Sequence, residues 1–179
     1  MNEKKKILAL LGSTKEDSSN SKILENFTRL TESFFEVDIY PINELPYFNP
    51  DIDNDNATPT SVTNFRKCIE KADGVIICTP EYIFSIPGIL KNALEWTVST
   101  VVFNDKPTAL IIASTSGDKA HESLELVMKT IGAKVGDKSS MLIKSVKTKL
   151  NQQGKINNPD TLNELEELIE DFKNNVRKI

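Results

Sequence analysis

Short apolar runs alternate with amphipathic segments along this chain, and that alternation limits the folds it can adopt. Residues 6–13 (KILALLGS), 73–79 (DGVIICT) and 107–114 (PTALIIAS) are apolar runs that end in small or polar residues. Such runs are typical of strands that are buried on both faces of a sheet. Two further strands are predicted at 35–42 and 139–144, and helices at 20–32, 62–71, from Pro87 onward, 118–131 and 160–176.

Strand and helix alternate five times, which implies right-handed crossovers and a parallel sheet covered by helices on both faces. With 179 residues, of which 39% are hydrophobic, the chain suits one domain spanning 1–179. Residues 43–61 are rich in Pro, Asn and Asp and have no hydrophobic period, so we expect a long loop there. Tyr47 and Phe48 are the aromatic exceptions within it.

Charge and composition exclude several classes of partner. The net charge is -4 and the basic residues form no long run, so nucleic-acid binding is not expected. No apolar stretch approaches the roughly 20 residues that cross a bilayer, and we expect no membrane association. Cys68, Cys78 and the single His121 lack the spacing of a disulfide scaffold or a metal site. A small-molecule partner, no bound metal and a reducing cytoplasm are therefore expected.

In open parallel sheets, ligands bind beyond the carboxyl ends of the strands, where the strand order reverses. The loops to inspect therefore follow the strands at 6–13, 73–79 and 107–114. The first loop, GSTKEDSSNSK, has one glycine and matches neither a dinucleotide fingerprint nor a Walker A sequence. Its hydroxyl and amide groups lie just before a helix N-terminus, where free N–H groups favour a monoester phosphate: Ser13, Thr14, Ser18, Ser19 and Asn20.

Two lysines support an anion at this helix end. Lys15 lies in the loop, and Lys22 lies in the first helical turn, where a cation opposes the helix dipole by about 0.3–1 kcal/mol unless an anion is near. The alternative is that Ser18 or Ser19 simply caps the helix. The loop alone leaves both interpretations open.

The second loop, TPEYIFSIPG, forms a short corner between a buried strand and a buried helix. Pro87 suits the first helical position, with Ser85 or Ile86 near the cap. The backbone of the corner would face the crevice and line the polar edge of a flat heterocycle, with Tyr82 packing near it and Glu81 setting charge or geometry. Alternatively, the tyrosine is an ordinary surface aromatic and the glutamate a solvated carboxylate.

These loops resemble a known family. GSTKEDSSN is similar to the G-S-x-R-x-x-S-x-N loop, and PEYIFSIPGILKNALEW to the P-E-Y-N-x-S-x-P-G-x-L-K-N-A-x-D-W segment, of the NAD(P)H-dependent FMN reductases. LPYFNPDID and NQQGKINNPDTLNELEEL also look like the family's counterparts, so the resemblance covers essentially the whole chain. It implies a three-layer flavodoxin-like α/β fold, with a five-stranded parallel sheet of order 2-1-3-4-5 and helices on both faces. The group includes chromate, azo and quinone reductases.

The resemblance also implies noncovalently bound FMN, with NADPH or NADH as electron donor. Carried over residue by residue, it places the FMN phosphate at Ser13, Lys15, Ser18, Ser19 and Asn20. The isoalloxazine ring would be bordered by Pro80, Glu81, Tyr82, Ile83 and Ser85 of the second loop, and by Ser114, Ser116 and Gly117 of the third loop, STSGDKAHE. A homodimer or homotetramer is implied too, with the Tyr47–Phe48 loop directed toward a neighbour's flavin.

Three departures from the family pattern bear on FMN affinity and nicotinamide access rather than on the fold. Lys15 stands in place of the usual Arg, which keeps the positive charge and loses the bidentate fork that suits phosphate. Ile83 replaces an Asn whose amide could contact the ring, so backbone contacts alone would remain there. The third loop lacks a common Gly-Gly pair, and we expect larger side chains from Asp118 to His121 to narrow the space near the ring.

No side chain is predicted to act as a catalytic acid or base. His121 is the one conventional candidate, and a lone histidine in the first turn of a helix is more often structural or exposed. Cys78, at the end of a predicted buried strand, is expected to be a small buried hydrophobe rather than a reactive thiol.

We therefore expect an FMN-dependent oxidoreductase that passes electrons from NAD(P)H through bound FMN to a small acceptor: a quinone, an azo compound, free flavin or a metal oxyanion. Two alternatives are open. The first is an FMN-binding electron carrier without efficient nicotinamide turnover, which Ile83 and a crowded third loop would favour. The second is a phosphate-ligand-binding or protein-interaction domain that kept the scaffold and lost the cofactor.

Overall fold

The computed structural model describes residues 3–54 and 56–177. Five parallel strands form one sheet in the order β2-β1-β3-β4-β5, which confirms the predicted topology. The strands are β1 (Lys5–Leu11), β2 (Phe35–Tyr40), β3 (Gly74–Thr79), β4 (Pro107–Ala113) and β5 (Lys134–Ile143).

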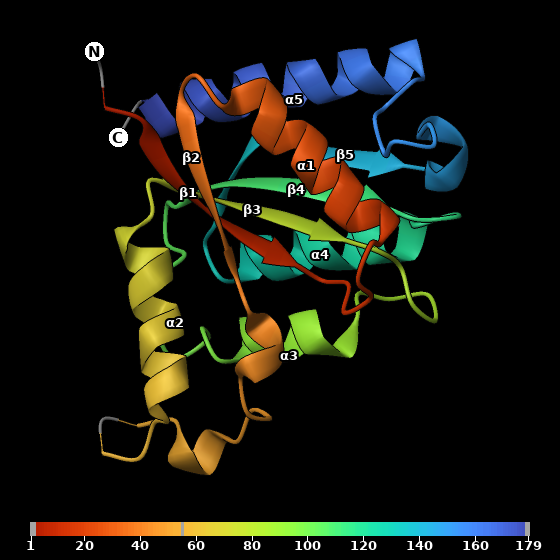
Figure 1. Ribbon diagram of the computed structural model, residues 1–179. Helices are drawn as coiled ribbons and strands as arrows, with labels where there is room; N and C mark the ends of the chain where they lie inside the picture. The colour runs from red at the N-terminus through yellow and green to blue at the C-terminus, as the bar shows by residue number, and fades with distance from the viewer. Residues whose placement is uncertain (1–2, 55, 178–179) are drawn as a thin grey trace.

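The helices cover both faces of this sheet, as Figure 1 shows. On one face lie α1 (Ser19–Thr31) and α5 (Pro159–Arg177), and on the other lie α2 (Thr60–Lys71), α3 (Gly88–Glu95) and α4 (Asp118–Thr130). None of the helices in the described ranges is long and apolar enough to span a bilayer.

The inner strands are apolar on both faces because helices pack against both. Ile7 and Ala9 of β1 belong to the core beneath α1 and α5, whereas Leu8 and Leu10 belong to the core beneath α2, α3 and α4. Successive side chains of a strand point to opposite faces, so one continuous apolar run supplies both cores. Phe172 of α5 lies in the same core as Ile7, which packs the last helix onto the sheet.

Two element boundaries differ clearly from the sequence predictions. The first is α3, whose N-cap is Pro87 with an extended backbone (φ -57°, ψ 141°), so the proline lies one position before the first helical residue rather than at it. The second is β5, which begins at Lys134 rather than at 139. Its first half is mostly polar and its register with β4 shifts between Thr108 and Leu110, so no apolar run marks it in the sequence.

A bulge in β5 accounts for that register shift. Leu110 pairs with Ser140, although Thr108 pairs with Val135, so extra residues of β5 loop out between these pairs. The Asp171 carboxylate of α5 holds the bulge by accepting hydrogen bonds from the Ser139 hydroxyl at 2.7 Å and from the Lys138 N–H at 3.1 Å.

Among the described residues of the predicted loop at 43–61, the 3-10 turn η1 (Ile42–Glu44) begins one residue before it, the 3-10 turn η2 (Pro50–Ile52) lies inside it, and α2 begins within it at Thr60. Its first part is held by α3. The Asn92 Oδ1 accepts a hydrogen bond from the Phe48 N–H at 2.7 Å, and the Phe48 ring packs edge-on against Trp96 with centroids 5.0 Å apart. Phe48 is therefore partly buried against the core, whereas Tyr47 is 93% exposed.

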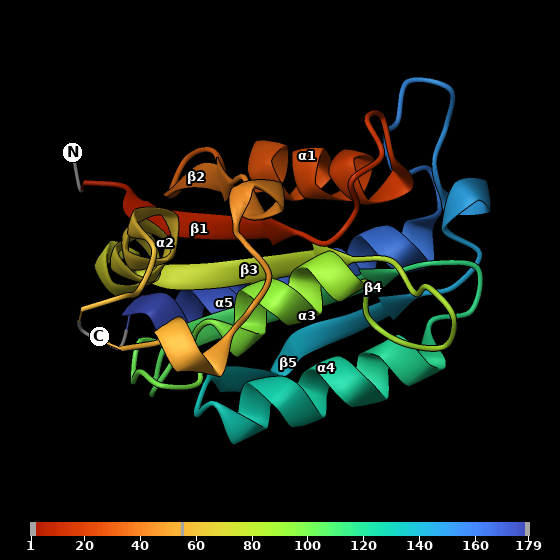
Figure 2. The same cartoon turned by 90° about the horizontal axis from the view of Figure 1, so that it is seen from below.

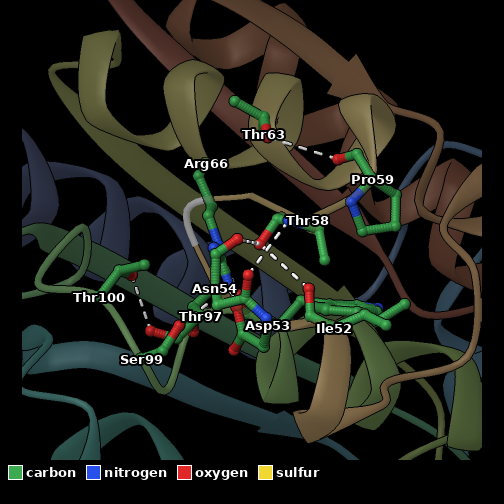
Figure 3. A network of polar contacts seen from close by, with 12 residues as sticks. Ile52, Asp53, Asn54, Thr58, Pro59, Thr63, Arg66, Thr97, Ser99 and Thr100 are labelled. Carbon is green, nitrogen blue, oxygen red and sulfur yellow. Dashed lines mark hydrogen bonds and ion pairs between the residues drawn. The ribbon is translucent and has the colours of Figure 1, made fainter.

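The second part of this loop is held by Arg66 of α2, shown with its surroundings in Figure 3. The Arg66 guanidinium donates to the Asp53 carboxylate at 2.6 Å and to the Trp96 carbonyl at 2.7 Å. The side chains of Arg66 and Asp53 are 15% and 6% exposed, so this ion pair is largely withdrawn from water.

The loops that follow β1, β3, β4 and β5 all lie at the carboxyl end of the sheet (Figures 1 and 2). β1 and β3 are neighbours there, and their ends approach closely at Gly12. A Cβ atom built on Gly12 would lie 2.7 Å from the Cβ of Thr79, so a larger residue would force the two strand ends apart. This is the switch point of the sheet, where open parallel sheets bind their ligands.

Candidate functional site

A cavity of about 790 Å³ opens at the switch point. Four loops line it: residues 13–22 after β1, 80–82 after β3, 113–115 after β4 and 145–151 after β5. Among the predicted site residues, those that line the cavity are Ser13, Lys15, Ser18, Ser19, Asn20, Pro80, Glu81, Tyr82 and Ser114. The others, which are not part of the lining, are Ile83, Ser85, Ser116 and Gly117.

The start of α1 forms one wall of the cavity. Ser18 is the N-cap, and its hydroxyl oxygen accepts a hydrogen bond from the Ser21 N–H at 3.0 Å, which confirms the capping interpretation for this side chain. Within the described residues, the backbone N–H groups of Ser19 and Asn20 donate to no other group. The first turn holds no acidic residue, so the positive end of the helix dipole is left available to an anion.

The charges around this wall are mostly positive. Lys15, Lys22 and Lys147 line the cavity. Lys22 is paired with Asp17 at 3.0 Å, whereas no ion pair within the described ranges engages Lys15 or Lys147. Two unpaired ammonium groups beside free helix N–H groups make an electrostatic site for a phosphate.

Asn20 ties the start of α1 to the sheet. Its side chain is buried, and the Nδ2 donates to the Ala113 carbonyl at 3.0 Å. The Cys78 thiol donates to the Asn20 carbonyl at 3.3 Å, so one residue joins α1 to the ends of β3 and β4. Cys78 is fully buried, which confirms the expectation of a small buried residue, and this burial raises the pKa of its thiol.

Glu81 links the second loop to the third. One carboxylate oxygen accepts from the Ser116 hydroxyl at 3.1 Å and the Gly117 N–H at 3.2 Å, and the other accepts from the N–H groups of Lys119 and Ala120, both at 3.0 Å. These backbone donors lie at the start of α4, so Glu81 caps that helix from a distant segment. Gly117, the N-cap of α4, has φ +98°, a conformation that favours glycine.

The same contacts determine the charge state of Glu81. Desolvation raises the pKa of its carboxyl, but the hydrogen bonds from Ala120, Gly117, Ser116 and Lys119 outweigh this effect and hold the pKa below its usual value. Glu81 is thus an ionised residue that fixes geometry, and not the free solvated carboxylate of the alternative interpretation.

Residues 82–85 form a short β-hairpin with a two-residue turn. The N–H of Tyr82 donates to the Ser85 carbonyl at 2.9 Å, and the N–H of Ser85 donates to the Tyr82 carbonyl at 3.1 Å. The two residues between them, Ile83 and Phe84, have φ values of 51° and 56°, as a type I′ turn requires. Their side chains are 95% and 76% exposed, which explains why Ile83 does not line the cavity.

The loop after β5 was missed in the sequence. Its cavity-lining residues are Ser145, Val146, Lys147, Thr148, Leu150 and Asn151, several of them in the 3-10 turn η3 (Val146–Lys149). The N–H of Val146 donates to the Ser114 carbonyl at 3.1 Å, which joins this loop to the one after β4. The lysine-rich stretch KSVKTK directly after a strand next to β4 was the available signal.

Residues 118–121, which were expected to narrow the space near the ring, do not line the cavity. The Asp118 carboxylate pairs with the Lys144 ammonium at 2.7 Å, and about half of each side chain is exposed. The Nε2 of His121 lies 2.8 Å from the Ser140 hydroxyl, so the histidine contacts β5 as a structural residue would.

Comparison with known proteins supports the family resemblance found in the sequence. A model of the NADPH-dependent FMN reductase family matches residues 5–148. The chain is 32% identical over 171 residues to the NADH:(hydroxy)cinnamate reductase subunit CrdA of Vibrio ruber, covering 92% of this chain and 84% of that protein. It is 31% identical over 173 residues to the 2-hydroxy-1,4-benzoquinone reductase of a Burkholderia species, covering 93% of each.

A solved structure shares the fold over its full length. FerB, a flavoenzyme NAD(P)H:(acceptor) oxidoreductase from Paracoccus denitrificans, superposes with a TM-score of 0.85 at 27% identity, covering 97% of this chain and 98% of that one. The family match includes all five strands, and the loops that carry the sequence resemblance line the cavity. This chain therefore belongs to the NADPH-dependent FMN reductase family.

Proposed function

We propose that this protein is an FMN-dependent oxidoreductase that transfers electrons from NAD(P)H to a quinone-type acceptor. The observation that carries the proposal is the cavity at the switch point, which combines free helix N–H groups and unpaired lysines with the Glu81–Tyr82 corner. This donor set fits FMN, which carries a phosphate at one end and a planar ring at the other. When bound, FMN supplies the acceptance of hydride and the donation of electrons.

The residues of the first loop would hold the phosphate. Ser19 and Asn20 offer backbone N–H groups, Lys15 offers positive charge, and Ser13 and Ser18 shape the loop through their own hydrogen bonds. Lys147, on the opposite loop, adds a second ammonium group to the same cavity. This second cation offsets the loss of the bidentate contact where the family has an arginine in place of Lys15.

The residues of the second and third loops would border the ring. Pro80, Tyr82 and Ser114 line the cavity directly. Glu81 keeps the two loops at a fixed spacing through its hydrogen bonds from Ser116 and Gly117. Ser116 and Gly117 would therefore position the loops without contacting the ring. Ser85 acts in the same indirect way, because its backbone closes the hairpin that begins at Tyr82.

The overall reaction needs no acid or base from the chain. NAD(P)H gives up a hydride and becomes NAD(P)⁺, and the quinone gains that hydride equivalent and one proton from solvent to become a hydroquinone. Two electrons leave the donor and two reach the acceptor. The same balance applies to other two-electron acceptors, such as an azo compound or free flavin, and a metal oxyanion accepts electrons from the same donor in further steps.

The visible absorption spectrum of the purified protein tests this function. We expect a flavin spectrum that bleaches on anaerobic addition of NADPH or NADH and returns when a quinone is added. A protein that is colourless and takes up no added FMN would exclude the proposal. Slow bleaching with both nucleotides would favour the electron carrier, which a crowded third loop would also favour, although residues 118–121 do not line the cavity.

We further propose that residues 1–179 form a single domain that assembles as a homodimer or homotetramer in the cytoplasm. Tyr47, in the loop that the family resemblance directs toward a neighbouring copy, is 93% exposed, which supports a contact between copies there. The cysteines Cys68 and Cys78 are both free, as is usual in a reducing compartment. Sedimentation equilibrium of the wild type and of Tyr47→Asp tests the assembly, since the charge should weaken a contact that buries Tyr47.

A further inference from the structure

The hairpin of residues 82–85 presents an apolar tip beside the cavity. Tyr82 lines the cavity and is 48% exposed, and the next two residues, Ile83 and Phe84, are almost wholly in solvent. Figure 2 shows the loop between β3 and α3 extending past the end of the sheet. An apolar surface therefore stands next to the site that we assign to FMN.

Two unfavourable features coincide at this tip. Both residues adopt left-handed backbone conformations, which a β-branched isoleucine and a bulky phenylalanine rarely do and which Asn, Asp or Gly adopt readily. Both side chains also remain in water, so neither gains the stability of burial. Local strain of this kind is concentrated at functional sites, where it serves the mechanism.

The tip is held rigidly from both ends. Two backbone hydrogen bonds join Tyr82 to Ser85, and the next residue, Ile86, is buried in the core. On the other side, the Glu81 carboxylate is fixed by its hydrogen bonds to the start of α4. A surface fixed in this way binds a ligand without a cost for ordering the loop.

The chemistry of the tip points to one kind of ligand. Ile83 and Phe84 carry no charge, and the neighbouring carboxylate of Glu81 already accepts hydrogen bonds from one hydroxyl and three N–H groups. A flat, uncharged aromatic molecule can pack against the phenylalanine ring and the isoleucine side chain, whereas a strongly hydrated anion gains nothing there.

We propose that Ile83 and Phe84 are specificity-determining residues, which contact the electron acceptor and favour uncharged lipophilic quinones over hydrophilic anions such as ferricyanide. This inference rests on the proposed function, because it concerns the acceptor of that reaction. It concerns a position where this chain departs from the family pattern, since Ile83 stands in place of an asparagine.

The test uses the FMN-loaded protein and three single variants: Ile83→Asn, Phe84→Asn and Leu126→Gln. Leu126 is a matched control, because it is an exposed apolar residue (66%) on α4, outside the hairpin of residues 82–85. Binding of 1,4-naphthoquinone to the oxidised protein is measured by equilibrium dialysis without NAD(P)H. The specificity constant kcat/KM is then measured for 1,4-naphthoquinone and for ferricyanide.

We expect both hairpin variants to bind the quinone more weakly and to lose about tenfold in kcat/KM for it, since an apolar contact of one side chain discriminates by about this factor. Ferricyanide reduction should be unchanged, and Leu126→Gln should match the wild type with both acceptors. Ile83→Asn should also raise the melting temperature of the protein, because asparagine tolerates the left-handed conformation.

Three results would overturn the inference while leaving the proposed function intact. The first is an equal loss of kcat/KM with both acceptors. The second is unchanged quinone binding in both hairpin variants. The third is a smaller species in sedimentation of these variants with unchanged quinone binding, which would show that the tip is instead a contact between copies. A wild-type protein that binds no FMN would overturn the proposed function and this inference together, and the absorption spectrum identifies that case at once.

Discussion

Glu81 shows how one side chain can organise a site without facing its ligand. Its two oxygens accept hydrogen bonds from four donors in the loop after β4 and at the start of α4. These contacts join the second and third loops, so the spacing between the two walls of the proposed ring site depends on a single carboxylate. The helix end gains a cap that its own N-cap, Gly117, cannot provide.

Replacing Glu81 by glutamine should therefore cost stability and flavin affinity together. The amide keeps one acceptor oxygen but turns an NH₂ group toward N–H donors, so we expect Glu81→Gln to lower the free energy of unfolding by about 1 kcal/mol, as the loss of a helix cap does. Urea denaturation measures this. Glu122→Gln is the control, because Glu122 is exposed and pairs with Lys119 alone. Equal effects of the two changes would contradict the role of Glu81.

The pH dependence of that difference follows from the pKa. The pKa of Glu81 is lower in the folded protein than its ordinary value of 4.5, so its contribution to stability is present above pH 4.5 and disappears as the pH falls through the lowered value. The stability gap between wild type and Glu81→Gln should therefore close on acidification. A gap that stays constant down to strongly acid pH would show that the charge of Glu81 is not involved.

At this scale the sequence identified Glu81 as a residue that sets charge or geometry, but it did not identify the partners through which Glu81 does so. The loops of a parallel sheet and the family pattern were enough to predict Ser13, Lys15, Ser19 and Pro80 as neighbours of one cavity. The partners of Glu81 lie more than thirty positions away along the chain, and no local pattern encodes them. Side-chain hydrogen bonds of that kind depend on how two loops meet in space.

At the scale of elements, the segment 43–61 has little regular structure and is held by contacts at two places. Asn92 of α3 and Trp96, the C-cap of that helix, hold residues 46–48, and Arg66 of α2 holds Asp53. The composition of the segment predicted a loop correctly. Its anchors could not be predicted, because a Pro-Asn-Asp-rich stretch indicates turns but does not indicate which helix they contact.

Removing the Arg66 side chain should release the second half of this segment. In Arg66→Met the buried Asp53 carboxylate loses its partner, so we expect the free energy of unfolding to fall by about 3 kcal/mol, with partial recovery in the double variant Arg66→Met, Asp53→Asn. Urea denaturation tests both. Lys138→Met is the control, because the Lys138–Glu167 pair is exposed to solvent and should contribute little to stability. If Arg66→Met and Lys138→Met lower the free energy of unfolding by the same amount, the buried pair does not anchor the segment.

The register of β5 explains why the loop after β5 was not predicted to be part of the site. β5 was predicted from its apolar second half, SSMLIK, and the loops after β1, β3 and β4 were inspected because they border the switch point. The bulge brings the end of β5 level with β4, since Ile143 pairs with Ala113. The residues after Ile143 therefore reach the cavity, which could not be inferred without the register of the edge strand.

For the whole molecule, the cavity joins four loops, so a ligand in it should stabilise the entire fold. FMN that binds the native state alone, at a free concentration of 100 times its Kd, raises the free energy of unfolding by about 2.7 kcal/mol. For a chain of this size that corresponds to roughly 5–10 °C in melting temperature. Differential scanning calorimetry with and without FMN measures the shift.

Riboflavin and a pair of lysine variants locate the phosphate in that experiment. Riboflavin lacks the phosphate and should give a smaller shift. Lys147→Gln should reduce the shift with FMN and leave the shift with riboflavin unchanged, whereas Lys149→Gln, on a neighbouring lysine outside the cavity lining, should change neither. Equal stabilisation by both flavins would mean that the phosphate does not lie among these lysines.

The bulge in β5 also affects whether a further strand can pair with the edge of the sheet. β5 is an edge strand, and its outer row of N–H and C=O groups would otherwise be a template for a strand of another chain. The extra residues between Val135 and Ser140 break that row, and Lys134 and Lys138 add charge along it. By holding the bulge with Asp171, the last helix protects this border of the molecule against edge-to-edge aggregation.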